Sequence, residues 1–343
     1  MRPREVFVAG LGAHLPAVVP AAEAVAAGHW TAEQAERTGA LGAAVAGDTP
    51  APEMALSAAR QALRRSGTEP GELGALLYAD VYHAGPDGWL PHSHLQRQLG
   101  CGHAFAAGIR QGCNGLFGAL ELAAVHLQAD ARHPAALVVA ADNFTSPLLD
   151  RWQCLHPEQV LADGASAAVL RRGAGFARLA SISSTTVVEL EELHRGGEPL
   201  HPAGVLRGRA LDYAARFRAF ARTAAPGLGL ALVKARTELL DRVLDEADIG
   251  AADLARVVCN HGSRASVEDA LLSTLDVPLE RSNWDFGRRI GHVGASDQLL
   301  SLEDLAGRDD LVAGEHVLLY GMGPGLSLAA AVLEIVDTPP WRR

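Results

Sequence analysis

The chain has 343 residues, of which 48% are hydrophobic and 20% are charged, and its formal net charge is -10. This length can form two units around a large core, and the acidic balance disfavours nucleic acid as a partner, because phosphate binding needs a basic excess. Since the chain shows no secretory signal, no apolar run of about 18 residues and no disulfide framework among its four cysteines, we expect a cytoplasmic protein with free thiols and no membrane contact.

Short runs rich in Val, Leu and Ala recur along the chain between Gly or charged residues, a pattern that predicts strands buried on both faces. Segments with helical spacing lie between them, and the alternation of the two predicts a layered α/β fold. The expected strands are 5–12, 73–81, 134–142, 165–172, 254–262, 315–323 and 326–335, and the expected helices include 50–67, 227–249 and 297–308.

The order of these elements is similar in two halves of the chain, which indicates an internal duplication. We place the N-terminal half at residues 1–180 and the C-terminal half at 181–343. The stretch 183–223 differs from both, because it is charged and rich in Gly and Pro. We expect this stretch to be an insertion or cap over an active site.

Cys113 lies between two glycines, in the sequence GCNG, directly before an apolar helical run. The start of a helix offers partial positive charge and free N–H groups, which favour the reactive thiolate. Gly112 and Gly115 allow a tight turn that a substrate can approach. The alternative is a buried structural cysteine, which is common.

Three further segments carry polar groups suited to chemistry. His261 follows an apolar strand, in NHG, and His292 and Asp297 flank small residues before a helix, in GHVGASD. Asp297 alone could be only a helix N-cap. The loop GMGPG at 321–325 could direct N–H groups at an oxyanion.

Together these segments resemble the ketoacyl synthase III branch of the thiolase superfamily, over almost the whole chain. The resemblance implies a five-layer αβαβα thiolase fold made of two similar halves, and a homodimer. The matching segments are GLGAHLP (10–16), ERTGALG (36–42), TPAPEMALSAARQAL (49–63), GCNGLFGALELA (112–123), LADGASAAVL (161–170), NHG (260–262) and GMGPG (321–325).

The resemblance also implies roles for single residues. Cys113 would be the nucleophile that carries an acyl group, and His261 a base or a hydrogen-bond donor to the acceptor. An oxyanion would be held by the N–H of Cys113 and an N–H of the 321–325 loop. Gly323 and Gly325 of this loop, with Arg151 and Trp152, are candidate contacts for the acyl donor.

The chain departs from the family pattern at positions that decide the chemistry. His292 stands where decarboxylating members have Asn, Pro324 replaces a glycine and has no N–H, and the motif at 260–262 has lost its Gln and Asn. The pattern is more similar to an atypical subgroup that acylates hydroxyls in secondary metabolism and uses an Asp. Asp297 would pair with either His292 or His261 to make a base.

Three functions follow as alternatives: an acyltransferase to a hydroxyl or amine, a ketosynthase that condenses an acyl starter with malonyl carrier protein and primes a polyketide, and a non-catalytic partner subunit. The donor would be an acyl thioester of coenzyme A or of acyl carrier protein, the acceptor a small molecule. We expect no permanently bound cofactor and no metal. His194 and His201 could reach the pocket from the cap, or lie in a solvated loop.

Overall fold

The computed structural model describes residues 1–155, 157–200 and 208–342. Within them, nine strands form one hydrogen-bonded sheet in the order β5-β4-β6-β7-β1-β8-β11-β10-β9. Two further strands form a small separate antiparallel sheet. The strands of the main sheet are β1 (Val6–His14), β4 (Leu73–Ala79), β5 (Phe105–Ile109), β6 (Ala135–Asp142), β7 (Gly164–Arg172), β8 (Ala177–Thr186), β9 (Leu254–Val258), β10 (His316–Gly323) and β11 (Ser327–Ile335), and the small sheet pairs β2 (Val18–Pro20) with β3 (Gly42–Ala44).

The nine strands divide into two halves that meet at β1 and β8, which share only two residue pairs, Phe7 with Arg178 and Val8 with Ala177. Five strands belong to the first half and four to the second. In each half one parallel pair, β4 with β6 or β9 with β10, is followed in the sheet by two antiparallel pairs, β6-β7-β1 or β10-β11-β8. This repeated order confirms the expected duplication within a thiolase fold. The boundary that we set after residue 180 falls inside β8.

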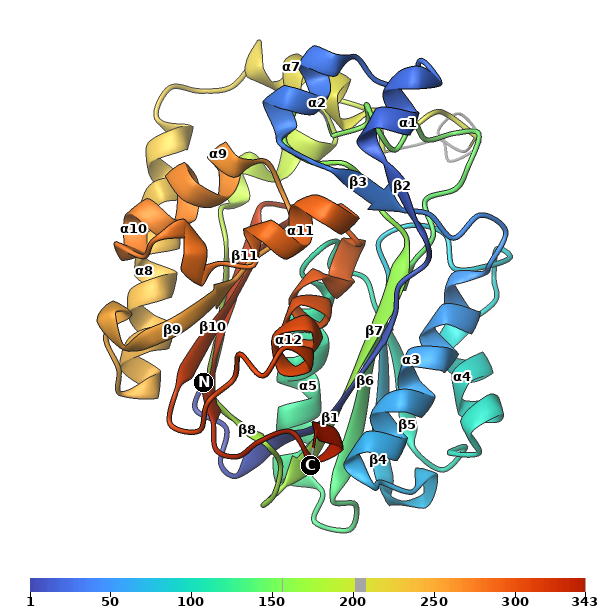
Figure 1. Cartoon of the computed structure of the whole chain (residues 1–343), viewed down its shortest axis with the longest axis vertical. Coiled ribbons are helices and arrows are strands. Elements are labelled where there is room, and N and C mark those ends of the chain that lie inside the picture. Colours follow the sequence, from blue (N-terminus) through green and yellow to red (C-terminus); the bar gives the residue numbers. More distant parts are fainter. Residues whose placement is uncertain (156, 201–207, 343) are drawn as a thin grey trace.

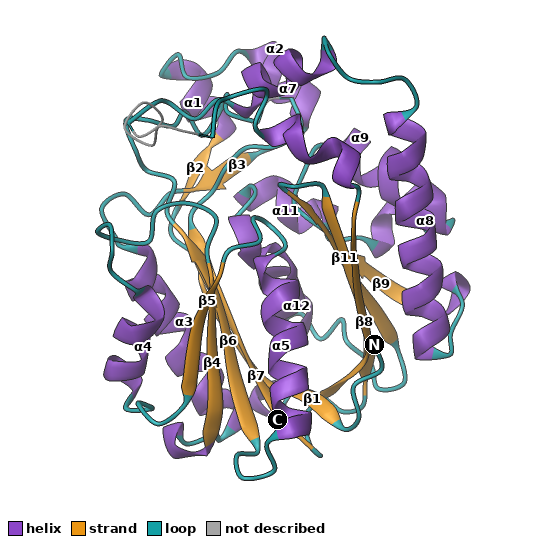
Figure 2. Cartoon of the chain, turned by 180° about the vertical axis from the view of Figure 1, so that it is seen from behind, coloured by secondary structure: helices purple, strands orange, loops and turns teal. Residues whose placement is uncertain are grey.

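Helices cover both halves and also separate them. Figures 1 and 2 show α5 and α12 between the two groups of strands, α3 and α4 outside the first group, and α8 outside the second, which gives the five layers αβαβα. The helices are α1 (Ala21–Ala26), α2 (Ala32–Thr38), α3 (Ala51–Ser66), α4 (Pro91–Leu99), α5 (Gly115–Ala129), α7 (Tyr213–Ala221), α8 (Leu228–Ala247), α9 (Arg264–Val267), α10 (Ser273–Leu275), α11 (Trp284–Ile290) and α12 (Asp297–Gly307).

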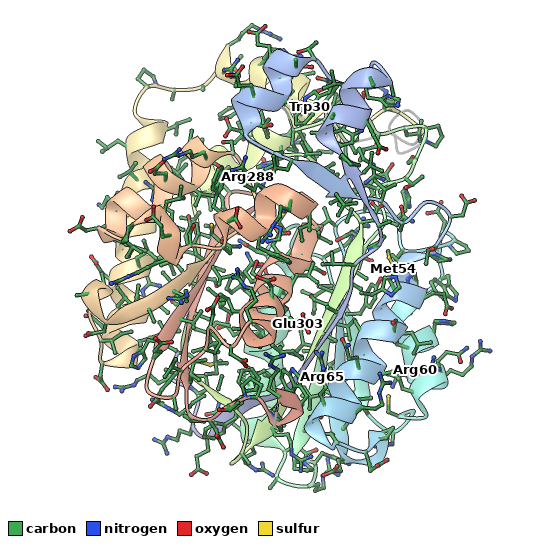
Figure 3. The ribbon with its side chains drawn as sticks, in the orientation of Figure 1. Trp30, Met54, Arg60, Arg65, Arg288 and Glu303 are labelled. Carbon is green, nitrogen blue, oxygen red and sulfur yellow. The ribbon has the colours of Figure 1, made fainter. Side chains whose placement is uncertain are left out.

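The outer helix α3 packs tightly on β1 because both are built of small residues. Its buried face is mostly alanine, and a Cβ at Gly10 would lie 2.5 Å from the carbonyl oxygen of Ala62. Glycine is therefore required where strand and helix approach. Arg65 of α3 also pairs with Glu303 of α12 at 2.8 Å, and Figure 3 shows these two side chains next to each other.

The large core lies between the two halves and around α5. The seven expected strands correspond to β1, β4, β6, β7, β9, β10 and β11, and most of these are nearly continuous apolar runs because helices cover both of their faces. β5 and β8 were not expected. None of the helices in the described part of the chain combines the length and the apolar character needed to cross a bilayer.

Candidate active site

Cys113 lies in the turn between β5 and α5, two residues before the helix begins. Gly112 has φ +55°, a left-handed conformation that favours glycine, and a Cβ there would lie 2.5 Å from Cδ of Pro324. The turn at Gly112 and the 321–325 loop, one from each half of the chain, thus pack closely against each other beside Cys113. The Cys113 side chain is partly buried and faces a cavity.

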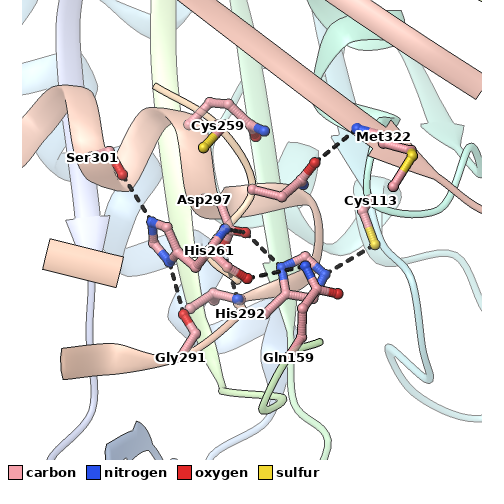
Figure 4. Close-up of polar contacts among 12 residues, drawn as sticks. Cys113, Gln159, Cys259, His261, Gly291, His292, Asp297, Ser301 and Met322 are labelled. Carbon is pink, nitrogen blue, oxygen red and sulfur yellow. Dashed lines mark hydrogen bonds and ion pairs between the residues drawn. The ribbon is translucent and has the colours of Figure 1, made fainter. Parts of the chain in front are cut away.

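His292 connects Cys113 to Asp297. The Sγ atom of Cys113 lies 3.1 Å from Nε2 of His292, and Nδ1 of the same ring lies 2.5 Å from Oδ2 of Asp297 (Figure 4). His292 and Asp297 are both buried. The structure thus brings together three of the four expected catalytic residues in the order thiol, imidazole, carboxylate, and it pairs the ring of His292 with Asp297.

The backbone around His292 is held on both sides, so the ring has little freedom. The N–H of His292 donates to the carbonyl of Val160 at 2.7 Å, and its carbonyl accepts from the N–H of Ala162 at 2.8 Å. The N–H of Val293 donates to Oδ1 of Asp297 at 2.7 Å. Asp297 therefore fixes the turn that carries His292 while it also bonds the ring.

The charge of Asp297 changes the protonation of its neighbours. Burial alone would lower the pKa of His292, but Asp297 and the Cys113 sulfur together outweigh it and hold this pKa well above its usual range. Burial would likewise raise the pKa of Asp297, but the two histidines and the hydrogen bonds lower it instead. The arrangement favours a protonated His292 between the Asp297 carboxylate and the Cys113 sulfur.

His261 lies in the same network but turns away from the cavity. Its Nδ1 bonds the carbonyl of Gly291 at 2.7 Å, and its Nε2 bonds Oγ of Ser301 at 2.8 Å (Figure 4). Its backbone N–H donates to Asp297 at 2.7 Å. With both ring nitrogens engaged, His261 has no donor or base left for an acceptor, so the geometry does not support the direct role expected for it.

The residue before it, Asn260, borders the cavity instead. Cys259 borders it as well, so two successive residues after β9 reach the cavity and His261 does not. The sequence motif predicted correctly that His261 follows β9, but no local signal indicated that Asn260 rather than His261 would face the cavity.

Arg151 and Trp152 do not face the cavity, which corrects their expected contact with the acyl donor. Arg151 makes two parallel hydrogen bonds to the buried carboxylate of Asp163, both of 3.0 Å, and is itself buried. Trp152 packs on Trp30 with ring centroids 5.2 Å apart. Both side chains are therefore used in holding the fold together.

The two glycines expected at the donor site differ in position. Gly323 borders the cavity, and a Cβ there would lie 3.2 Å from the backbone nitrogen of Cys113. Gly325 is not among the residues that border the cavity, and its φ of +80° serves the turn into β11. Only Gly323 thus lies next to the nucleophile.

The cavity beside Cys113 has a volume of about 390 Å³ and mostly apolar walls. It is bordered by residues of both halves and of the expected cap. Sequence reasoning missed most of these residues, since nothing local distinguishes them from core residues. They include Tyr82, Phe144, Leu155, Tyr213, Phe217 and Leu271.

The cap prediction concerns residues 183–223. Residues 183–186 belong to β8, whereas His194, Leu211, Tyr213 and Phe217 border the cavity. Burial lowers the pKa of His194 to about 4, so its ring is neutral near neutral pH. The segment 201–207, with His201, lies outside the described residues.

Comparison with known proteins connects this site to a family. Residues 108–186 match the family model of 3-oxoacyl-[acyl-carrier-protein] synthase III, and residues 244–335 match the model of its C-terminal part. The beta-ketoacyl-[acyl-carrier-protein] synthase III 3 of Streptomyces coelicolor is 28% identical over 293 residues, 82% of each chain. The corresponding synthase of Rhizorhabdus wittichii is 29% identical and covers 87% of this chain and 88% of its own.

Solved structures agree with the sequence matches. The structure of ChlB3, described as an acyltransferase, is 45% identical and superposes with a TM-score of 0.94 over 98% of this chain and 99% of its own. The Pseudomonas aeruginosa synthase III is 24% identical, with a TM-score of 0.79 over 98% and 99% of the two chains, and supports the fold. The chain therefore belongs to the ketoacyl-[acyl-carrier-protein] synthase III family of the thiolase superfamily, whose enzymes transfer and condense acyl groups.

Proposed function

We propose that this protein is an acyltransferase that takes an acyl group from a thioester onto Cys113 and passes it to a hydroxyl or amine, in secondary metabolism. The observation that carries the proposal is the contact of His292 with both Cys113, at 3.1 Å, and Asp297, at 2.5 Å. A histidine oriented by a carboxylate and facing the nucleophile is a proton carrier for acyl transfer. The name of the similar ChlB3 structure, an acyltransferase, adds support.

In the first step, the Cys113 thiolate attacks the carbonyl carbon of the donor thioester and forms the Sγ–C bond. The electrons of the C=O bond move to oxygen, and when they return the C–S bond of the donor breaks. The protonated Nε2 of His292 gives its proton to the leaving thiolate. The raised pKa of His292 favours this starting state, with the proton on the ring.

In the second step, the neutral His292 takes the proton from the acceptor hydroxyl while the acceptor oxygen attacks the acyl carbon. The tetrahedral intermediate then expels the Cys113 thiolate, and the ester product leaves. His292 is again protonated, so the enzyme returns to its first state. Asp297 stabilises the positive ring in both steps and keeps Nε2 directed at the cavity.

The substrates proposed for these steps fit the cavity. Its apolar walls suit the acyl part of a thioester, and its 390 Å³ limits that part to a small or medium group. Coenzyme A and acyl carrier protein present the same thioester on the same arm, and both remain proposed donors. His194, neutral and in the cap, contributes a polar group to these walls.

Condensation is the second candidate, because the family includes condensing enzymes. An enolate formed by decarboxylation needs two hydrogen-bond donors. His292 is engaged with the thiol, and the ring of His261 is turned to Gly291 and Ser301. This geometry favours transfer without decarboxylation over a ketosynthase.

The two candidates are distinguished by carbon dioxide release. Malonyl carrier protein labelled in its free carboxylate is incubated with the enzyme and an acyl-coenzyme A. We expect labelled carbon dioxide no faster than with the Cys113→Ala variant as the control. Release that requires Cys113 and accompanies a carbon–carbon bonded product contradicts the acyltransferase proposal. A protein that takes no acyl group from any thioester is instead the non-catalytic subunit.

We also propose that two copies pair through the β5 edge. This strand ends the sheet, and Phe105, Leu122 and Val125 of β5 and α5 are 59%, 49% and 47% exposed there. An unpaired edge beside apolar side chains is suited to a second strand. We expect light scattering to give about twice the chain mass of 35.9 kDa, and a mass equal to one chain contradicts the dimer.

A further inference from the structure

Acyl transfer to Cys113 requires donors for the oxygen of the tetrahedral intermediate, and the glycine-rich loop offers few of them. Pro324 has no N–H, and its ring lies against the nucleophile turn, with Cδ at 2.5 Å and N at 3.3 Å from the point that a Cβ of Gly112 would occupy. The N–H of Met322 is used within the protein. It donates to Oδ1 of Asn260 at 2.7 Å.

Asn260 offers the kind of donor that the loop lacks. Its Oδ1 accepts the hydrogen bond from the N–H of Met322, which fixes the orientation of the side-chain amide. The NH₂ group, Nδ2, is then the donor at the opposite side of the amide. This Nδ2 is shielded from solvent and has no hydrogen-bond partner among the described residues. A buried amide group without a partner is costly, so its persistence next to a catalytic thiol suggests a partner that arrives with the substrate.

Asn260 is also in the right place. It borders the same cavity as Cys113, His292 and Gly323. The residue that it holds, Met322, directly precedes Gly323, where a Cβ would lie 3.2 Å from the backbone nitrogen of Cys113. One amide thus joins the end of β9 to the loop that covers the nucleophile.

We propose that Nδ2 of Asn260 donates a hydrogen bond to the acyl oxygen as its negative charge develops, in place of the N–H that Pro324 lacks. Oδ1 meanwhile positions the loop through Met322. This inference rests on the proposed function, since it needs an acyl group on Cys113. It assigns to Asn260 the stabilisation of the intermediate, and to His292 the movement of protons.

The test compares two reactions of the same thiol. With p-nitrophenyl acetate, the Cys113 sulfur bonds the acetyl carbon and p-nitrophenolate leaves, while charge collects on the carbonyl oxygen. With iodoacetamide, the sulfur bonds the methylene carbon and iodide leaves, so no such charge forms. Both rates are taken as the part that disappears in Cys113→Ala. The ratio of the acylation rate to the alkylation rate therefore reports stabilisation of the oxyanion, because the reactivity of the thiol contributes to both rates.

Two variants separate the two ends of the amide. Asn260→Ala removes both, whereas Asn260→Asp keeps an oxygen for the N–H of Met322 and removes only the donor. We expect the ratio to fall by about 10²- to 10³-fold in both variants, the usual effect of losing one oxyanion donor. A merely structural role through Met322 would leave Asn260→Asp close to the wild-type protein.

The contrary results are distinct. An unchanged ratio in Asn260→Ala, a wild-type ratio in Asn260→Asp, or an equal slowing of both reactions overturns the role of Asn260 and leaves the proposed function standing. A wild-type protein that releases no p-nitrophenolate through Cys113 overturns the proposed function, and this inference with it.

Discussion

The Cys113→Ala variant is expected to lose acyl transfer by roughly 10⁴- to 10⁶-fold, the effect of removing a covalent nucleophile. The side chain is partly buried, so its truncation leaves the fold in place. The measurement is thiol release from a panel of acyl-coenzyme A donors, with water or an added alcohol as the acceptor. An unchanged melting temperature shows that the loss is chemical.

Cys101→Ala is the matched control for that loss. Cys101 is buried in the layer between α3, α4 and the first half of the sheet, away from the cavity, and we expect this variant to transfer acyl groups normally. Cys259 borders the cavity, but burial raises its pKa to about 12, so it stays a thiol. Acyl transfer that persists in Cys113→Ala would move the nucleophile elsewhere and contradict the site.

The Asp297→Asn variant is expected to lower the rate of acyl transfer by about 10²- to 10⁴-fold. The amide keeps the shape of the carboxylate but carries no charge to stabilise a protonated His292. Breaking a buried ionic contact also costs roughly 3–5 kcal/mol of stability, so unfolding by denaturant is measured beside the rate. Acyl transfer is then assayed only where the variant is folded.

The pH profile distinguishes loss of charge from loss of packing. Asp297 raises the pKa of His292, so the proton is held to higher pH in the wild-type protein. Without this charge the pKa of His292 falls, and the alkaline limb of the acylation profile moves to lower pH. Ser301→Ala is the control, because it removes a hydrogen bond from His261 and leaves His292 and Asp297 untouched. An unshifted limb in Asp297→Asn, or an equal shift in Ser301→Ala, contradicts the role of Asp297.

The sequence predicted the strands that are apolar on both faces, because burial under two helical layers leaves a continuous signal. The run expected at 134–142 is β6, Ala135–Asp142. It did not predict β8, whose serines dilute the pattern. Ser181 satisfies its hydroxyl by donating to the carbonyl of Val243 at 2.6 Å, a partner far along the chain.

The same limit applies to the site. The glycines around Cys113 predicted a tight turn before a helix, since a backbone conformation is a local property. The partner of Arg151 could not be inferred in the same way. Asp163, twelve residues further along the chain, forms a buried ion pair with Arg151. In the sequence alone, Arg151 cannot be distinguished from a basic residue that is free to bind a ligand.

Which of His261 and His292 pairs with both Asp297 and Cys113 depends on the direction in which each ring points, not on its position in the chain. Both lie within reach of Asp297, at 3.2 Å and 2.5 Å from its oxygens. Only the three-dimensional turn at Gly291 decides which ring meets the thiol. The chain spacing of five residues between His292 and Asp297 carries no such information.

The most direct test of the account is the intact mass of the wild-type protein after mixing with acyl-thioester donors, followed by peptide mapping. The account predicts a gain equal to one acyl group, located on Cys113 and lost again when a hydroxyl or amine acceptor is added. A chain that gains no mass from coenzyme A or carrier-protein thioesters, or that carries the acyl group on another residue, contradicts it.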